Sequence, residues 1–135
     1  MSLTESCIAA AVVSTVMAIA APSLMRVREN YILQSAARDV ATKMHATRVS
    51  AVARDRDCRM AVASAVSYVI ECQEASAWQV VDRVSLPEGV TVTANGRPEF
   101  HRRGNVSPTA TFAVWNRTGR SVRIVVNVNG RVRVQ

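Results

Sequence analysis

The sequence predicts an α+β fold, in which one long N-terminal α-helix packs on a C-terminal antiparallel β-sheet. Neither glycine nor proline occurs between Pro22 and Pro87, and apolar residues recur at helical spacing in the first part of that stretch. After Cys58, short β-branched segments alternate with turn residues. A single helix followed by a run of strands is the order of an α+β domain. The roughly 110 residues that follow the first 25 suffice for one small core.

The first segment, residues 1–25, is predicted to cross a membrane or to be buried in an assembly. The twenty residues Ser6 to Met25 carry no charge, Pro22 interrupts them, and one acid, Glu5, precedes them. A helix of this length spans about 30 Å, which is the thickness of the hydrocarbon core of a bilayer. A secretory signal peptide would need a positive charge ahead of the run, where the only charged side chain is that of Glu5.

Two other interpretations of this segment differ in whether the Glu5 carboxylate has a charged partner. A plain membrane anchor would hold the following Arg26 and Arg28 in the cytoplasm, which conflicts with a disulfide in the same domain. In an assembly, the segment would be buried against identical helices, where the Glu5 carboxylate of one copy neutralises the Met1 amine of the next. Repetition of such a heterologous contact gives a helical filament.

Glu5, the apolar run and Pro22 together resemble the N-terminus of a mature type IV pilin or type II secretion pseudopilin. In that family a prepilin peptidase removes a basic leader, and the new N-terminal residue is methylated. Met1 stands here either at that processed position or as an initiator. The resemblance implies that the chain is held in the inner membrane before assembly. It also implies identical or homologous pilin subunits as partners, and an extracellular pilus or periplasmic pseudopilus as the final location.

Residues 26–57 are predicted to continue the helix as an amphipathic segment, so that the helix runs from about residue 2 to 55 and stops at the sequence RDRDC. The apolar stripe, at spacings of three and four, consists of Leu33, Ala37, Val40, Met44, Thr47 and Ala51. The intervening solvated face consists of Arg38, Asp39, Lys43, His45, Arg48 and Ser50.

Residues 58–135 are predicted to form a β-rich domain that begins with a disulfide-linked hairpin. Cys58 and Cys72 lie symmetrically about Ala65, so a hairpin centred there would place the two thiols opposite each other. Such a bridge would contribute roughly 3 kcal/mol and implies an oxidising compartment. Cys7 lies inside the apolar run and cannot reach this domain.

Further strands are expected at Trp78–Val84, in VTVTA between the turn signals LPEG and NGR, in TATFAVWN, and in the last fifteen residues, where the NG at 129–130 indicates a hairpin turn. The segments LPEGVTV, EFHRRG, TFAVWN and SVRIVVNVNGRVRV resemble the GspH/FimT-type pilins and pseudopilins.

The positive charge is concentrated near the C-terminus. Up to Gly96 there are nine basic and nine acidic residues, whereas from Arg97 onward there are eight arginines and one acid, Glu99. This asymmetry indicates either an anionic partner or packing on acidic faces of neighbouring subunits. FimT-like pilins are associated with DNA capture through a GRxR-like element, which GRVR at 130–133 resembles. The candidate DNA-binding residues are Arg120, Arg123, Arg131 and Arg133.

We expect no catalytic residue, no metal site and no cofactor. His45 and His101 stand apart in the sequence, and Asp55 and Asp57 lie among arginines that suit local ion pairing. The predicted function is therefore that of a structural, self-assembling subunit of a type IV pilus. The alternatives are a minor pseudopilin of a type II secretion system and a FimT-like DNA-binding minor pilin.

Overall fold

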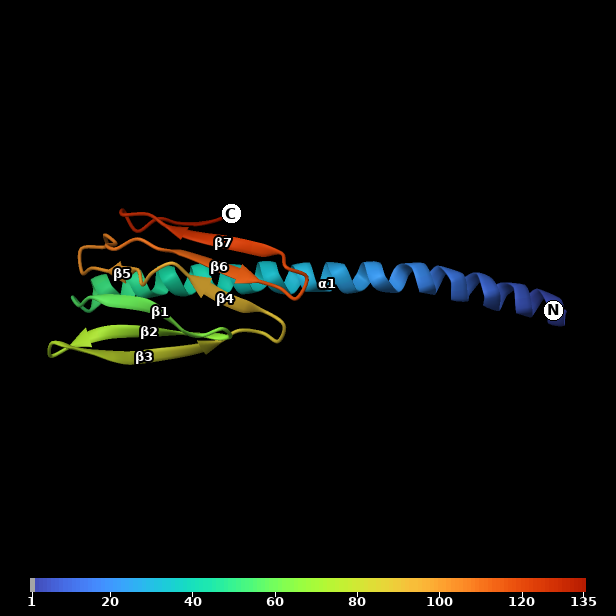
Figure 1. The fold of residues 1–135 in the computed structure, drawn as a ribbon, viewed down its shortest axis with the longest axis horizontal. Coiled ribbons are helices and arrows are strands. Elements are labelled where there is room, and N and C mark those ends of the chain that lie inside the picture. Colours follow the sequence, from blue (N-terminus) through green and yellow to red (C-terminus); the bar gives the residue numbers. More distant parts are fainter. Residues whose placement is uncertain (1) are drawn as a thin grey trace. The chain divides into compact units, whose positions relative to one another are not determined.

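The computed structural model describes residues 2–135, and these divide into two compact units, one ending at Tyr31 and the other comprising Ile32–Gln135 (Figure 1). Helix α1 is Leu3–Ala53, close to the predicted helix from residue 2 to 55. The strands are β1 Cys58–Ser64, β2 Ser67–Glu74, β3 Ala77–Ser85, β4 Thr91–Ala94, β5 Glu99–Phe100, β6 Thr111–Trp115, β7 Ser121–Val126 and β8 Val132–Val134.

The part of α1 in the second unit buries one face. All six residues of the predicted apolar stripe are buried, and Ala36 and Ala41 widen the stripe. Four of the eight buried residues are alanines, so this face of the helix has a shallow surface. The helix ends in a Schellman motif, in which the Arg56 amide donates to the Ala51 carbonyl at 3.1 Å and Asp55 has a φ of 50°.

The first hairpin forms as the cysteine spacing predicts. β1 and β2 are antiparallel, with Cys58 opposite Cys72, and a disulfide joins these two residues. Pairs from Cys58 to Val62 keep the predicted centre at residue 65. A shift between Val62 and Ser64 then leaves a connection of two residues, Ala65 and Val66.

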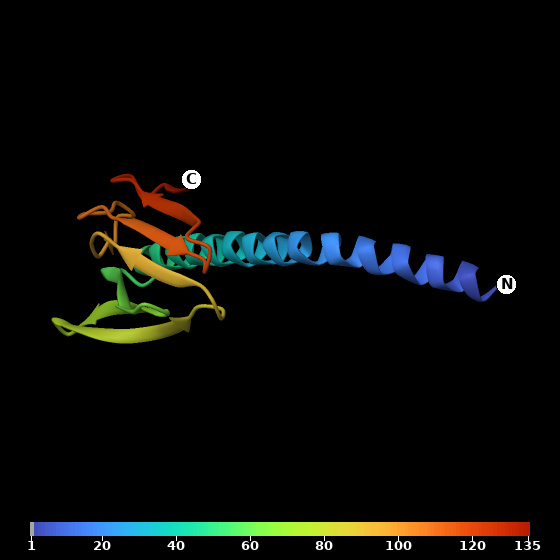
Figure 2. The same cartoon turned by 45° about the vertical axis from the view of Figure 1, so that its right-hand side comes forward.

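The α+β class is confirmed, but the strands form two four-stranded sheets instead of the single sheet expected. Their orders are β3-β2-β1-β5 and β4-β6-β7-β8, and Figure 2 shows them from a second direction. The division arises after β3, where the chain turns through Pro87 and Gly89, the latter at a φ of 83°. β4 then pairs with β6, while the later β5 returns to β1.

Strand β3 is an edge of the first sheet and is irregular. Its pairing with β2 shifts between Ile70 and Glu71, which leaves Val81 as an extra residue on β3. Such a β-bulge twists a strand locally and interrupts its regular hydrogen-bonding edge.

Both sheets and the helix contribute to one core. Its largest fully buried side chains include Tyr68, Phe100, Phe112, Met44 and Met60. Every buried core residue lies between Leu33 and Val126, so the second unit contains its own complete core. A soluble fragment of residues 28–135 is therefore suited to measurements of stability.

Arg48 connects α1 to two loops, although the sequence pattern placed it on a solvated face. Its Nε donates to the Gly104 carbonyl at 2.9 Å, and a terminal nitrogen donates to the Gly130 carbonyl at 3.4 Å. Lys43, from the same predicted face, forms a 2.7 Å ion pair with Asp82 of β3. Both side chains are half-buried, because strands and loops distant in sequence fold back over the sides of the helix.

Substitution of Gly130 by alanine is expected to destabilise the fold more than substitution of Gly119. Both glycines have positive φ, 75° and 80°, so each alanine costs about 1–2 kcal/mol of backbone strain. A Cβ at Gly130 would lie 2.6 Å from both the Arg48 Nε and the Gly104 carbonyl oxygen, whereas one at Gly119 meets nothing within 4 Å. We expect Gly130→Ala to cost about 1–3 kcal/mol more than Gly119→Ala, as measured by urea unfolding. Equal losses of unfolding free energy in the two variants would show that the contact with Arg48 does not restrict the loop at Gly130.

Tyr68 is expected to make the fold sensitive to alkali. Its side chain is buried, its hydroxyl has no hydrogen-bond partner within residues 2–135, and burial, together with Asp39 and Asp82, raises its pKa to about 12. Between pH 10 and 12 the unfolded chain loses the Tyr68 proton while the folded chain keeps it, so stability falls as pH rises. The loss reaches on the order of 3 kcal/mol at pH 12.

Tyr68→Phe should remove this part of the pH dependence, whereas Tyr31→Phe, which changes an exposed tyrosine, should retain it. Urea unfolding at pH 9 and pH 11 provides the comparison. The same loss of stability in wild type and Tyr68→Phe would refute the assignment.

Candidate functional site

The N-terminal unit exposes an uninterrupted apolar segment. Residues 2–28 are all exposed, and α1 contains a stretch long and apolar enough to cross a membrane. The large exposed side chains of this segment are Leu3, Ile8, Val12, Val13, Val16, Met17, Ile19, Leu24, Met25 and Val27. An apolar surface of this extent requires lipid or protein to cover it.

Glu5 lies in the first turn of α1, where it is part of a helix cap. Ser2 precedes the helix, and its Oγ accepts a hydrogen bond from the Glu5 amide at 3.3 Å. Serine at the cap with glutamate three residues later is the capping-box pattern, and a carboxylate in the first turn suits the positive end of a helix. Its carboxylate has no ion-pair partner within residues 2–135, and Met1, the other half of the predicted pairing, lies outside the described residues.

Pro22 lies within α1, which continues through it. Because proline has no amide hydrogen, the Ala18 carbonyl one turn earlier lacks its helical donor. The hydroxyls of Ser14 and Thr15 donate to the Ala10 and Ala11 carbonyls, as expected for such side chains in an apolar helix.

The second sheet has an exposed face that carries three of the four predicted arginines. Along β7, Val122, Ile124 and Val126 are buried, which directs Arg123 outward. Arg133 lies opposite Val125, the next outward residue of β7. Arg131 precedes Arg133 by two residues and therefore continues the same face. We call this set, Arg123, Arg131 and Arg133, the arginine face.

Arg120 does not belong to the arginine face. It ends the turn between β6 and β7, where its amide donates to the Asn116 side chain at 2.9 Å. Arg131 lies beyond the opposite end of β7, about 20 Å away at the rise of a six-residue strand. None of these four arginines forms an ion pair within residues 2–135, whereas Arg117 in the turn pairs with Glu88.

Trp115 is an aromatic residue on the outward side of the same sheet that our sequence reasoning did not single out. It pairs with Ser121 of β7, is 39% exposed, and donates from its indole nitrogen to Thr93 Oγ1 at 3.2 Å. The sequence contained the signal, because Phe112 and Val114 alternate with it and period-two alternation directs Trp115 outward.

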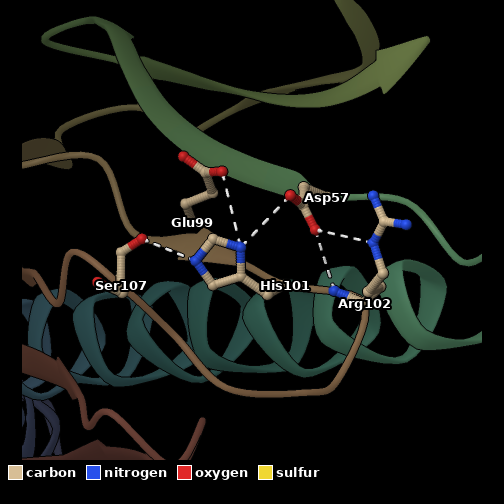
Figure 3. A network of polar contacts seen from close by, with 5 residues as sticks. All are labelled: Asp57, Glu99, His101, Arg102 and Ser107. Atoms are coloured by element: carbon tan, nitrogen blue, oxygen red, sulfur yellow. Dashed lines mark hydrogen bonds and ion pairs between the residues drawn. The ribbon is translucent and has the colours of Figure 1, made fainter. Parts of the chain in front are cut away.

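A third cluster gathers Asp57, Glu99 and His101, which the sequence analysis had treated separately (Figure 3). His101 Nδ1 lies 3.4 Å from Asp57 Oδ2 and 3.8 Å from Glu99 Oε1. The pairing of β1 with β5 brings the segments together. Asp57 does not pair with the arginines adjacent in sequence; its Oδ1 instead accepts from the Arg102 amide at 3.1 Å.

Comparison with solved structures finds the same fold in a type IV minor pilin and in a minor pseudopilin. The type IV minor pilin FimU of Pseudomonas aeruginosa matches with a TM-score of 0.65 at 17% identity, over 79% of this chain and 90% of that one. The minor pseudopilin EpsH of the Vibrio cholerae type II secretion system matches with a TM-score of 0.66 at 14% identity, over 76% and 95% of the two chains. No protein-family model and no curated protein sequence matches. The chain thus has the pilin and pseudopilin fold that its N-terminus predicted.

Proposed function

We propose that this protein is a self-assembling structural subunit of a type IV pilus, held in its filament by the packing of N-terminal helices. The observation that carries the proposal is the exposed, uncharged run from Ser6 to Met25, which precedes a unit with its own buried core. Such a segment is inserted in the inner membrane first and is later buried among copies of itself. The fold shared with a minor pilin and a minor pseudopilin supports a minor position in the filament.

The proposed contact between subunits joins Glu5 of one copy to the Met1 amine of the next. A carboxylate among apolar helices is costly unless a positive charge compensates it. Every subunit processed by a prepilin peptidase would carry such a charge at its N-terminus. The pairing sets the axial offset between copies, and its repetition continues without closing.

Glu5→Ala and Glu5→Lys are expected to abolish filaments while leaving membrane insertion intact, because each leaves a buried charge unpaired. Filaments are scored by electron microscopy of sheared cells, and insertion by membrane fractionation. Glu29→Ala, a carboxylate later in α1, is the matched control and should assemble.

The Ser2→Ala variant shows whether a defect in assembly arises from the helix cap or from the pairing of Glu5 between subunits. It removes the cap acceptor for the Glu5 amide but keeps the carboxylate, and should cost only about 1 kcal/mol locally. Filaments should persist in Ser2→Ala. Normal filaments from Glu5→Ala, or equal defects in Ser2→Ala and Glu5→Ala, would refute the pairing.

A second candidate function is DNA binding by the arginine face, as in a FimT-like minor pilin. The observation that favours it is the set of three exposed arginines on one face, unpaired within residues 2–135. Trp115 is outward on the same sheet, opposite Ser121 at the start of β7. Guanidinium groups bind phosphate bidentately, and an exposed indole offers a flat surface for a base. Such binding would be insensitive to sequence and sensitive to salt.

The DNA hypothesis predicts that Arg131→Ala with Arg133→Ala weakens binding of double-stranded DNA to the 28–135 fragment and lowers the steepness of its salt dependence by about 2. Fluorescence anisotropy at several salt concentrations measures both. Arg54→Ala with Arg83→Ala removes the same charge from other exposed positions and should have a smaller effect on both quantities. Equal losses in the two double variants would reject the arginine face as the site.

A further inference from the structure

We propose that Asp57, Glu99 and His101 form a binding site for a divalent transition-metal ion of the zinc class. The three residues come from different places: Asp57 lies just after α1, Glu99 is in β5, and His101 follows β5. Their ligand atoms lie within 4.8 Å of one another. An ion bound there would connect the end of the helix to the loop that follows β5.

The tautomer of His101 is the main argument for a positive ion at this position. The Ser107 carbonyl oxygen lies 3.1 Å from Nε2 and can only accept, so Nε2 carries a hydrogen (Figure 3). The other ring nitrogen, Nδ1, faces carboxylate oxygens of Asp57 and Glu99, which are acceptors. Arg102 Nε lies 3.9 Å from Asp57 Oδ1 and so offsets part of the Asp57 charge, but Oδ2 and the Glu99 carboxylate still face the ring. A cation among these three groups would offset the remaining charge.

The surroundings of the trio match those of metal ligands. A ligating histidine usually donates its second ring N–H to a carbonyl or carboxylate, as His101 does to Ser107. Asp57 uses Oδ1 to accept from the Arg102 amide, which orients Oδ2 toward Nδ1. The side chains of Asp57, Glu99 and His101 are 18%, 26% and 28% exposed, so they are held in place and yet open to an ion from solution.

The distances favour a small ion that accepts nitrogen. Ligands bound at 2.0–2.1 Å in a tetrahedral site lie about 3.3 Å from each other. The separations of 3.4 Å and 3.8 Å between Nδ1 and the two carboxylates approach that value, and all three ligand atoms lie within 4.8 Å of one another, so a bound ion would draw the carboxylates closer together. Calcium and magnesium prefer all-oxygen sites, whereas imidazole with carboxylates suits zinc and its neighbours. Three protein ligands leave a fourth position for water.

The full chain in detergent micelles, with Cys7→Ser to remove the free thiol, tests the proposal. Thermal unfolding is followed with zinc chloride, with calcium chloride, and with excess EDTA. We expect zinc to raise the Tm by several degrees in a saturable manner, EDTA to reverse the rise, and calcium to have little effect. His101→Ala should weaken zinc binding by more than about 100-fold in calorimetric titration, because even second-shell partners contribute 10- to 100-fold. His45→Ala, an exposed histidine on α1, should retain it.

Cobalt(II) gives a spectroscopic readout that does not depend on the stability of the fold. In the Cys7→Ser protein it should produce visible absorption bands that zinc displaces and that the Asp57→Asn variant lacks. The absence of a zinc-dependent Tm rise, an equal rise in His101→Ala, or an equal rise with calcium would overturn the proposal. So would a Tm that rises on mild acidification and is then unaffected by zinc, which would mean that a proton on Nδ1 fills the role of the ion.

Discussion

The structure of the second unit depends on the burial of one face of α1, from Leu33 to Ala51, against two sheets. The strand ladders of the two sheets are separate, and the buried residues of the helix face belong to one cluster with buried residues of both sheets. Each larger buried side chain of that face, Leu33, Val40 or Met44, contributes about 1.5–3 kcal/mol. The edges of the helix are secured by polar contacts of lower energy, Arg48 to two loop carbonyls and Lys43 to Asp82.

The two units differ in whether the apolar side chains of α1 are exposed or buried. Before residue 29 the large apolar residues are exposed, and from Leu33 onward the stripe is buried. Folding therefore buries the apolar core of the second unit and leaves the apolar surface of the first unit exposed. Under the proposed function, lipid would cover this surface before assembly and neighbouring subunits would cover it afterwards. A stable fold and a surface available for assembly are in this way assigned to different stretches of sequence.

The sequence predicted those features that depend on local spacing. The helix stripe follows from the period of three and four, and the Cys58–Cys72 hairpin follows from symmetry about Ala65. The sequence did not predict features that depend on the pairing of distant strands, because residue spacing does not show which strands pair. The division into two sheets, the loops around Arg48 and the cluster of Asp57 with His101 are of this kind. The grouping of Arg120 with Arg123 stays a prediction, since Arg120 stands at the end of the turn that leads directly into β7.

The irregular edge of β3 has a consequence for a protein that polymerises. A long exposed strand can recruit other chains edge to edge, and this mode of association competes with any ordered filament. β3 runs for nine residues, but the bulge at Val81 breaks its regular edge and Asp82 and Arg83 place charges beside it. Edge-to-edge association through β3 is thereby discouraged, which favours the helix contact that the proposed filament requires.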